Sequence, residues 1–266
     1  MNFKFTKMHG IGNAYAFVNC FKYNLNGINL NRLAKKIADN EKGIDSDGLI
    51  LILPSKKADF KMRIFNADGS EAEMCGNGIR CFAKYVYDNK LTKKKELAIE
   101  TLAGIIKTKI IKMDSHKNYT VKVDMGKVKI KEIKLSVDGK RYDVAYVSIG
   151  NPHCVLFVEN FKFNYKSLGK KIEHHNLFPN RINVEFVKVD NPKEITMRVW
   201  ERGSGETKAC GTGACASVVA SILRNKTEKN VTVHLLGGDL DIEWAKNNHV
   251  YMTGPAEEMF SGKFKA

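Results

Sequence analysis

Two short stretches decide the fold: EMCGNGIRC at residues 73–81 and KACGTGACA at residues 208–216. Each places a cysteine, Cys75 or Cys210, directly before a Gly-x-Gly turn, and an apolar run with helical spacing follows. Glycines at a helix start let the unpaired backbone N–H groups approach an anion such as a carboxylate. The pattern therefore predicts two helices, each opening with a cysteine and an anion-binding turn.

These stretches belong to a longer repeat. The two cysteines are 135 residues apart, about half of the 266-residue chain. A strand-like run (KMRIF, TMRVW) and a turn (NADGS, ERGSG) precede each one, and Glu71 and Glu206 each lie four residues before their cysteine. Two similar domains are therefore expected, at residues 1–115 and 116–253, with the boundary in the polar stretch KMDSHKN.

Short runs that alternate apolar and polar residues recur along the chain, from FKFT at residues 3–6 to HVYMTG at residues 249–254, as in half-buried strands. Helical spacing is confined to four places, near residues 31–38, 76–88, 166–175 and 211–225. The fold class predicted from this pattern is a strand-rich α+β protein.

The net charge of +15 raises the possibility of a nucleic-acid partner. The basic residues are 36 Lys and only 8 Arg, spread along the chain, whereas groove recognition relies on Arg. We therefore expect no nucleic-acid partner. No apolar run approaches the length of a membrane span, and the N-terminus lacks a signal-peptide pattern. We expect a cytoplasmic protein without membrane contact.

The six cysteines argue against a metal site. A structural zinc site uses close pairs such as C-x2-C, whereas the local spacings here are C-x5-C and C-x4-C. We expect no metal, and four cysteines are assigned to packing: Cys20, Cys81, Cys154 and Cys215.

Cys75 and Cys210 carry the expected chemistry. The field of a helix N-terminus lowers the pKa of an adjacent thiol. Two such thiols on opposite faces of an amino-acid α-carbon would allow one to remove the α-proton and the other to return a proton. The turns would stabilise the charge that builds on the carboxylate. No motif demands pyridoxal phosphate, so no cofactor is expected.

A second class of enzyme uses one cysteine as a nucleophile with a histidine base. His153, in GNPHC, would supply that base in a hydrolase or acyl transferase. This alternative leaves the second cysteine motif unexplained.

The motifs resemble those of the diaminopimelate epimerase family over nearly the whole chain. KMHGIGN, FNADGSEAEMCGNGIRC, GNPHCVLFV, IEHHNLFPNRINVEFV and RVWERGSGETKACGTGACA occur in the family's order. The resemblance implies two pseudo-symmetric domains, each a mostly antiparallel curved sheet around a central helix, and a C-terminal tail, residues 254–266, that packs back on the first domain. It also implies a homodimer that interconverts L,L- and meso-diaminopimelate for lysine and peptidoglycan synthesis.

The resemblance also assigns roles to residues. It makes Cys75 and Cys210 the two acid–base groups and His153 a supporting residue. Substrate binding is assigned to ten positions: Asn13, Asn66, Gly76, Asn77, Asn151, Asn183, Glu201, Arg202, Gly211 and Thr212. Among these, Arg202 would bind the distal carboxylate in a bidentate manner.

Two positions depart from the family's pattern. Ala14 stands where an acidic residue is usual, and Asp45 stands where a glycine is expected. A glycine position often needs positive φ, which Asp tolerates better than most residues. These departures leave open another amino-acid substrate, such as histidine, with the same two-cysteine chemistry.

Overall fold

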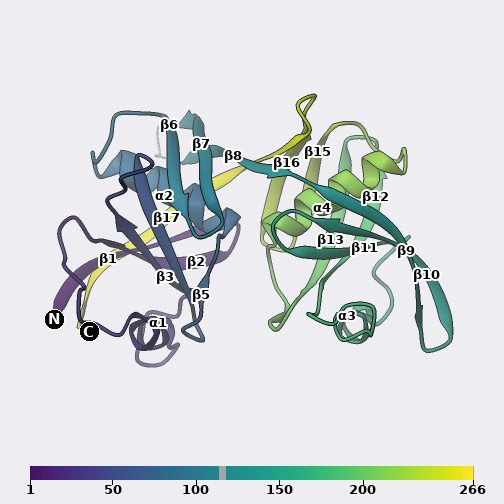
Figure 1. The fold of residues 1–266 in the computed structure, drawn as a ribbon, viewed down its shortest axis with the longest axis horizontal. Helices are drawn as coiled ribbons and strands as arrows, with labels where there is room; N and C mark the ends of the chain where they lie inside the picture. Colours follow the sequence, from purple (N-terminus) through teal and green to yellow (C-terminus); the bar gives the residue numbers. More distant parts are fainter. Residues whose placement is uncertain (114–117, 266) are drawn as a thin grey trace. The chain divides into compact units, whose positions relative to one another are not determined.

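The computed structural model describes residues 1–113 and 118–265 as two compact units (Figure 1). Unit 1 comprises Met1–Val123 together with Gly254–Ala266, and unit 2 comprises Asp124–Thr253. The chain passes from one unit to the other inside two strands, β8 and β17. The boundary expected between residues 115 and 116 lies outside the described residues.

Strands dominate both units. The elements from the N-terminus to the middle of the chain are β1 (Asn2–Gly10), β2 (Asn13–Asn19), α1 (Leu30–Ala38), β3 (Gly48–Leu53), β4 (Phe60–Asn66), β5 (Glu71–Ala72), α2 (Gly76–Asp88), β6 (Glu96–Thr101), β7 (Gly104–Met113) and β8 (Tyr119–Lys127). They continue as β9 (Lys129–Val137), β10 (Lys140–Ser148), β11 (Pro152–Phe157), α3 (Tyr165–Glu173), β12 (Asn183–Asn191), β13 (Glu194–Glu201), β14 (Gly205–Glu206), α4 (Gly211–Leu223), β15 (Asn230–Leu235), β16 (Gly238–Trp244) and β17 (His249–Lys265).

The two units repeat one strand topology. In unit 1, β2 pairs parallel with β3 and β4 parallel with β6, whereas the pairs β1–β2, β3–β4 and β6–β7 are antiparallel. In unit 2, β11 and β12 form one parallel pair and β13 and β15 the other, again among antiparallel neighbours. The predicted strand-rich, mixed fold with few helices is confirmed.

In each unit, one helix lies on either face of the first parallel pair, which is β2–β3 in unit 1 and β11–β12 in unit 2. In unit 1, α1 packs on the face that carries Leu49 and Leu51, and α2 lies on the face that carries Ile50. In unit 2, α3 packs on Val184 and Phe186 of β12, whereas the first turn of α4 lies against Glu185. Helices α2 and α4 are therefore buried along most of their length.

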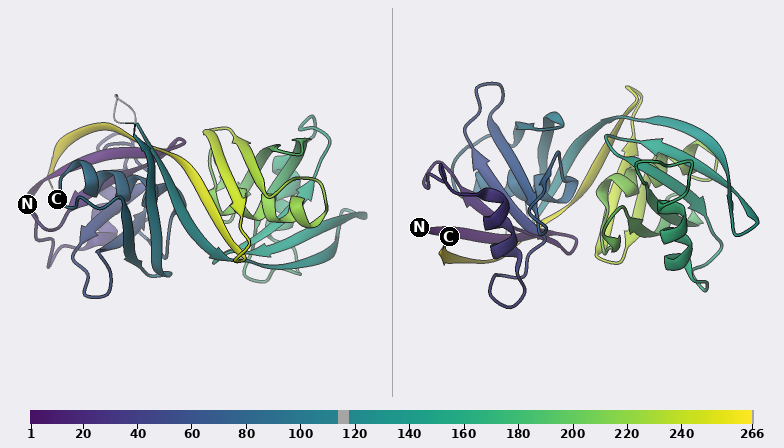
Figure 2. Two further views of the ribbon diagram at one scale, coloured as in Figure 1. Left: turned by 90° about the horizontal axis from the view of Figure 1, so that it is seen from above. Right: turned by 60° about the horizontal axis from the view of Figure 1, so that its bottom comes forward.

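All four helices were predicted within about three residues, but several strands were not. Strand β9 reads KIKEIKLSV and buries few side chains, β16 includes a turn glycine, and the run after residue 254 is mostly exposed. The alternation in β9 is interrupted between Ile130 and Ile133, whereas the alternating run of β16 is a strand that the prediction omitted. Residues 257–265 nevertheless pair antiparallel with β1, and the two strands run side by side in both views of Figure 2.

Candidate functional site

Each motif cysteine is the N-cap of its helix. Cys75 precedes α2 with φ −135°, and its Sγ accepts a hydrogen bond from the N–H of Gly78 at 3.4 Å. Cys210 precedes α4 with φ −122°, and its Sγ accepts from the N–H of Gly213, also at 3.4 Å. A thiol in this position lies at the positive end of the helix dipole. Both predicted cysteine–helix junctions are therefore present.

The half-site in unit 1 gathers polar groups from β2 around Cys75. The thiol lies 3.4 Å from Oδ1 of Asn13, which also accepts from Nδ2 of Asn77 at 3.4 Å. The amide of Asn13 is fixed by Asp47, since its Nδ2 donates to Oδ2 of that residue at 2.8 Å. Tyr15, two residues farther along β2, is buried and shares a hydrogen bond with Cys75.

The half-site in unit 2 has a corresponding arrangement at the start of β11. Asn151 donates from Nδ2 to Oγ1 of Thr212 at 3.2 Å, and that hydroxyl lies 3.6 Å from Sγ of Cys210. His153, two residues farther along, is fully buried. Its Nε2 lies 3.0 Å from Oδ1 of Asn151, so all four side chains form one connected group.

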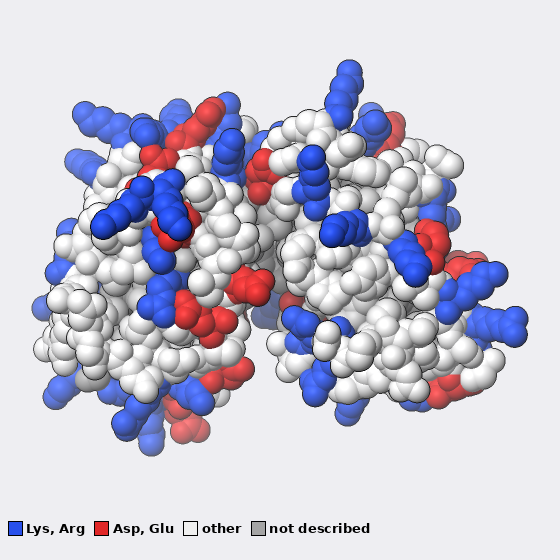
Figure 3. All heavy atoms as spheres, in the orientation of Figure 1, with Lys and Arg blue, Asp and Glu red and all other residues white. Residues whose placement is uncertain are grey.

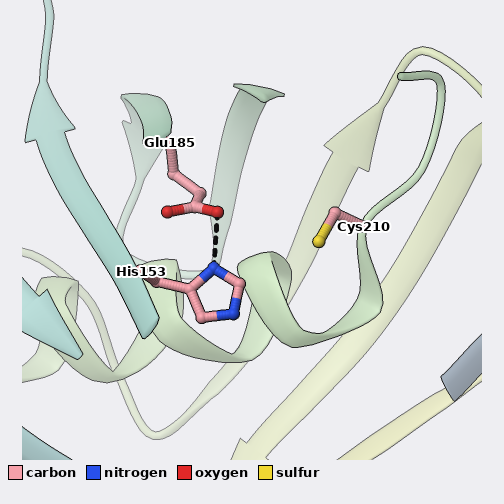
Figure 4. A group of neighbouring side chains, drawn as sticks. All are labelled: His153, Glu185 and Cys210. Carbon is pink, nitrogen blue, oxygen red and sulfur yellow. Dashed lines mark hydrogen bonds and ion pairs between the residues drawn. The ribbon is translucent and has the colours of Figure 1, made fainter. Parts of the chain in front are cut away.

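Two carboxyl groups adjoin Cys210, a buried one from Glu185 and a half-buried one from Glu201. Glu185 on β12 lies 2.7 Å from Nδ1 of His153 through Oε1 (Figure 4). Glu201 at the end of β13 shares hydrogen bonds with Cys210 and with Thr207. Burial raises the pKa of Glu201.

The thiol pKa values differ from the prediction. The N–H groups of the helix starts do lower each value, but burial raises it more, so the pKa of Cys75 lies above its ordinary range. The pKa of Cys210 lies further above, because burial acts first and the carboxylates of Glu201 and Glu185 add to it. The predicted net lowering is therefore wrong, since transferring a thiolate out of water costs more than one helix start returns.

The remaining predicted residues have diverse contacts. Asn183 uses its whole amide within unit 2, donating to Pro152 O at 2.9 Å and accepting from the N–H of Arg202 at 2.9 Å. The guanidinium of Arg202 is exposed and reaches the carbonyl of Asn180 at 3.3 Å. Asn66 holds a turn instead, donating to Ser70 Oγ at 3.1 Å. Gly76, Asn77, Gly211 and Thr212 form the first turns of α2 and α4.

The two family departures are accommodated locally. Asp45 adopts φ +52°, the left-handed region in which glycine is expected. The N–H of Ala14 donates to Oδ2 of Asp47 at 2.6 Å, so an acidic side chain is present near this turn although it comes from another position. The expectation that Asp tolerates the glycine conformation is confirmed.

His153, Glu185 and Cys210 also form the kind of cluster that binds metals, with ligand atoms within 4.8 Å of one another. Two ligands of one tetrahedral zinc ion lie about 3.3 Å apart, given bonds of about 2.0 Å. Nδ1 of His153 and Oε1 of Glu185 are only 2.7 Å apart, which is a hydrogen-bond distance. The cluster is therefore built as a hydrogen-bonded pair beside a thiol.

Sequence reasoning missed Tyr15 and Glu185. Tyr15 follows Asn13 as His153 follows Asn151, so the repeat itself contained the signal for it. Glu185 lies in the alternating run INVEFVKV, where a polar residue is expected to face solvent. In the structure α3 covers one face of β12 and α4 the other, so the glutamate is buried.

The sequence pattern that defines the diaminopimelate epimerase family matches residues 5–131 and 145–259. The chain belongs to this family. It is 53% identical to the diaminopimelate epimerase of Acetivibrio thermocellus and 49% identical to that of Methanococcus maripaludis strain C6, with 98% of this chain covered in both cases and 98% and 99% of the relatives. Family membership makes it an isomerase of the epimerase type.

Solved structures with low identity share the fold. A PhzF-family phenazine biosynthesis protein from Bacillus anthracis matches with a TM-score of 0.76 at 16% identity, over all of both chains. A probable proline racemase from Agrobacterium radiobacter K84 matches with a TM-score of 0.75 at 13% identity, over 99% of this chain and 93% of that one. The chain therefore shares its fold with both of these proteins.

Proposed function

We propose that the protein interconverts L,L- and meso-diaminopimelate with Cys75 and Cys210 as its two acid–base groups and without a cofactor. The observation that carries the proposal is the pair of thiols, each N-capping a helix that opens with Gly-x-Gly, in a chain 53% identical to a diaminopimelate epimerase. The positive end of a helix dipole suits a carboxylate.

The chemistry needs one thiolate and one thiol. The thiolate takes the α-proton from one face and becomes a thiol, leaving the bonding electron pair on the α-carbon and its carboxylate. The opposite thiol then gives its proton to the other face and becomes the thiolate. The first turns, at Gly76, Asn77, Gly211 and Thr212, would bind the reacting carboxylate as its charge grows.

The rest of the substrate would contact the side chains that surround the two thiols. The exposed guanidinium of Arg202 suits the distal carboxylate, because its donors match both oxygens. Glu201 would bind the amino group, and Asn13, Asn66, Asn151 and Asn183 would line the site. Asn13 and Asn151 already contact Cys75 and Thr212, which supports their place near the reacting centre.

We further propose a cytoplasmic homodimer of two-domain subunits that acts in lysine and peptidoglycan synthesis and binds no nucleic acid. In the described residues, no helix is long and apolar enough to cross a membrane. Lys and Arg are distributed over the visible face of both units in Figure 3, with acidic side chains between them. A nucleic-acid surface would instead concentrate them.

Stereoisomer analysis tests the proposed substrate. The protein is dialysed against EDTA, reduced, and given L,L-diaminopimelate, L-histidine or L-lysine in separate reactions without pyridoxal phosphate. Chiral chromatography should show meso-diaminopimelate forming and no D-histidine or D-lysine. Racemisation of histidine alone would favour the alternative substrate, and no turnover of any amino acid would contradict the proposal.

A further inference from the structure

The two half-sites differ at one matched buried position. Ile50 and Glu185 each lie 25 residues before their motif cysteine, on β3 and β12. A Cβ added to Gly78 would meet Cδ1 of Ile50 at 2.7 Å, and one added to Gly213 would meet Oε1 of Glu185 at 2.7 Å. Unit 1 thus packs a methyl group beneath its helix start where unit 2 packs a carboxylate.

Placing a carboxylate there is costly. Glu185 is 0% exposed, and Ile50 shows that an apolar side chain fills the matched position without difficulty. A buried acid is tolerated when hydrogen bonds or an ion pair compensate for the lost water. The compensating group is His153, whose Nδ1 lies 2.7 Å from Oε1.

A chain of hydrogen bonds leads from this pair to the reacting sulfur. Nε2 of His153 lies 3.0 Å from Oδ1 of Asn151, whose Nδ2 donates to Oγ1 of Thr212 at 3.2 Å. Oγ1 lies 3.6 Å from Sγ of Cys210. Glu185 is therefore connected to the thiol through three intervening side chains.

The hydrogen bonds in this series all donate in one direction, toward Cys210. An amide oxygen only accepts hydrogen bonds, so Nε2 of His153 carries a hydrogen, whether the proton shared by Nδ1 and Oε1 lies on nitrogen or on oxygen. With Asn151 so oriented, its amino group donates to Thr212. The hydroxyl hydrogen of Thr212 is then left for Sγ of Cys210.

We propose that Glu185 is a positioning residue that holds His153 with its hydrogen on Nε2 and thereby directs the Thr212 hydroxyl toward the sulfur of Cys210. The inference rests on the proposed acid–base role of Cys210. A donor aimed at Sγ stabilises the thiolate each time Cys210 has given up its proton.

Titratable groups face Cys210 from three strands: His153 from β11, Glu185 from β12 and Glu201 from β13. The two carboxylates raise the pKa of Cys210, whereas Thr212 and the N–H of Gly213 lower it. If Glu185 acts on Cys210 through its charge alone, removing it lowers the pKa of Cys210. If it acts by directing the Thr212 hydroxyl, removing it raises that pKa.

Two substitutions separate these effects. E185L copies the apolar packing of Ile50 and leaves nothing to select the histidine tautomer. E185Q removes the charge, but its amide N–H can donate to Nδ1 and keep the hydrogen on Nε2. We expect E185L to lower kcat about 10-fold, with a midpoint of thermal unfolding no lower than the parent's, and E185Q to remain within about 3-fold of the parent.

The decisive readout is the pH dependence of iodoacetamide labelling at Cys210 in a C75A background, followed by peptide mass spectrometry without substrate. Thiolate ultraviolet absorbance, with C210A as the blank, gives the same titration if labelling is slow. E185L and T212V should each raise the pKa of Cys210 by about one unit, and E185L should add nothing to T212V. E185Q should shift the pKa less than E185L does.

The control is D239N, which removes the carboxylate from another His–Asp pair, with 2.9 Å between Nδ1 of His234 and Oδ1 of Asp239, at the exposed tip of the β15–β16 hairpin. D239N should shift nothing. Equal downward shifts in E185L and E185Q would show that only the charge matters and would overturn the inference. Because labelling needs no turnover, this result is independent of whether diaminopimelate is the substrate.

Discussion

At the residue scale, the proposed function rests on two thiols whose surroundings are unequal. Cys75 has the buried side chain of Arg80 near it, and this positive charge lowers the pKa of Cys75. Cys210 instead faces the carboxylates of Glu201 and Glu185, which raise its pKa. The less perturbed thiol is the easier one to ionise, so we expect Cys75 to carry the thiolate more often in the free enzyme.

The raised thiol pKa values predict the pH dependence of the reaction. One cysteine must be a thiolate, so kcat/KM falls as the pH drops through the pKa of that group; the other must be a thiol, so kcat/KM falls again at higher pH. Because burial raises both values, the acid limb should lie at or above about pH 8.5, the ordinary thiol pKa. Initial rates between neutral and strongly alkaline pH measure this, and a limb below neutrality would contradict it.

Substrate recognition predicts a specific effect of Arg202. R202Q removes the bidentate donor pair, so KM for diaminopimelate should rise about 100-fold, as expected for a lost charged contact of roughly 3 kcal/mol. R141Q, at an exposed arginine on β10, is the control and should leave KM unchanged. Steady-state kinetics of both variants would decide, and equal KM values would remove Arg202 from the site.

At the element scale, the repeat could be predicted from the sequence, and some of its parts could not. The 135-residue spacing and the apolar runs predicted α2 and α4 with their cysteine caps. Strand β9 was missed because Ile130 and Ile133 are three residues apart, which interrupts its alternation, and because few of its side chains are buried. Its place depends on backbone pairing with β10 along nine residues, which no local pattern reports.

The surroundings of Gly213 and Gly78 predict that the two positions tolerate an added methyl group to different degrees. In G213A the new Cβ meets Oε1 of Glu185, which His153 holds, and lies 3.2 Å from Sγ of Cys210. In G78A it meets the terminal methyl of Ile50, which can rotate. We expect G213A to lower the free energy of unfolding by about 2 kcal/mol and G78A by less than about 1 kcal/mol. Urea unfolding measures both, and equal losses would contradict this account.

The C-terminal strand should stabilise unit 1. Phe264 packs against Phe3 and Phe5 in the core, with ring centroids 5.9 and 6.5 Å apart, while residues 257–265 pair with β1. F264A should therefore lower the midpoint of thermal unfolding, at a cost of about 2 kcal/mol for a partly buried ring. M259A, at an exposed side chain of the same strand, is the control. Calorimetry that found the two variants alike would contradict this role.

At the scale of the whole molecule, the sequence predicted the family, the mixed fold and the paired motifs, because glycines and cysteines at fixed spacing leave a strong local signal. It did not predict Tyr15 or Glu185. Their roles depend on which strand lies beneath which helix, and that follows from pairing between distant segments. The roles of polar residues that are buried within alternating runs are therefore found from the structure and not from the sequence.

The most direct test of the two-thiol account follows the α-proton itself. The reduced protein, C75A and C210A are each incubated with L,L-diaminopimelate in D2O, and NMR and chiral chromatography report deuterium at the α-carbon and the stereoisomer formed. We predict deuterated meso-diaminopimelate with the parent protein and loss of inversion by at least about 1,000-fold in each variant. Inversion at the parent rate by either variant would contradict the central claim.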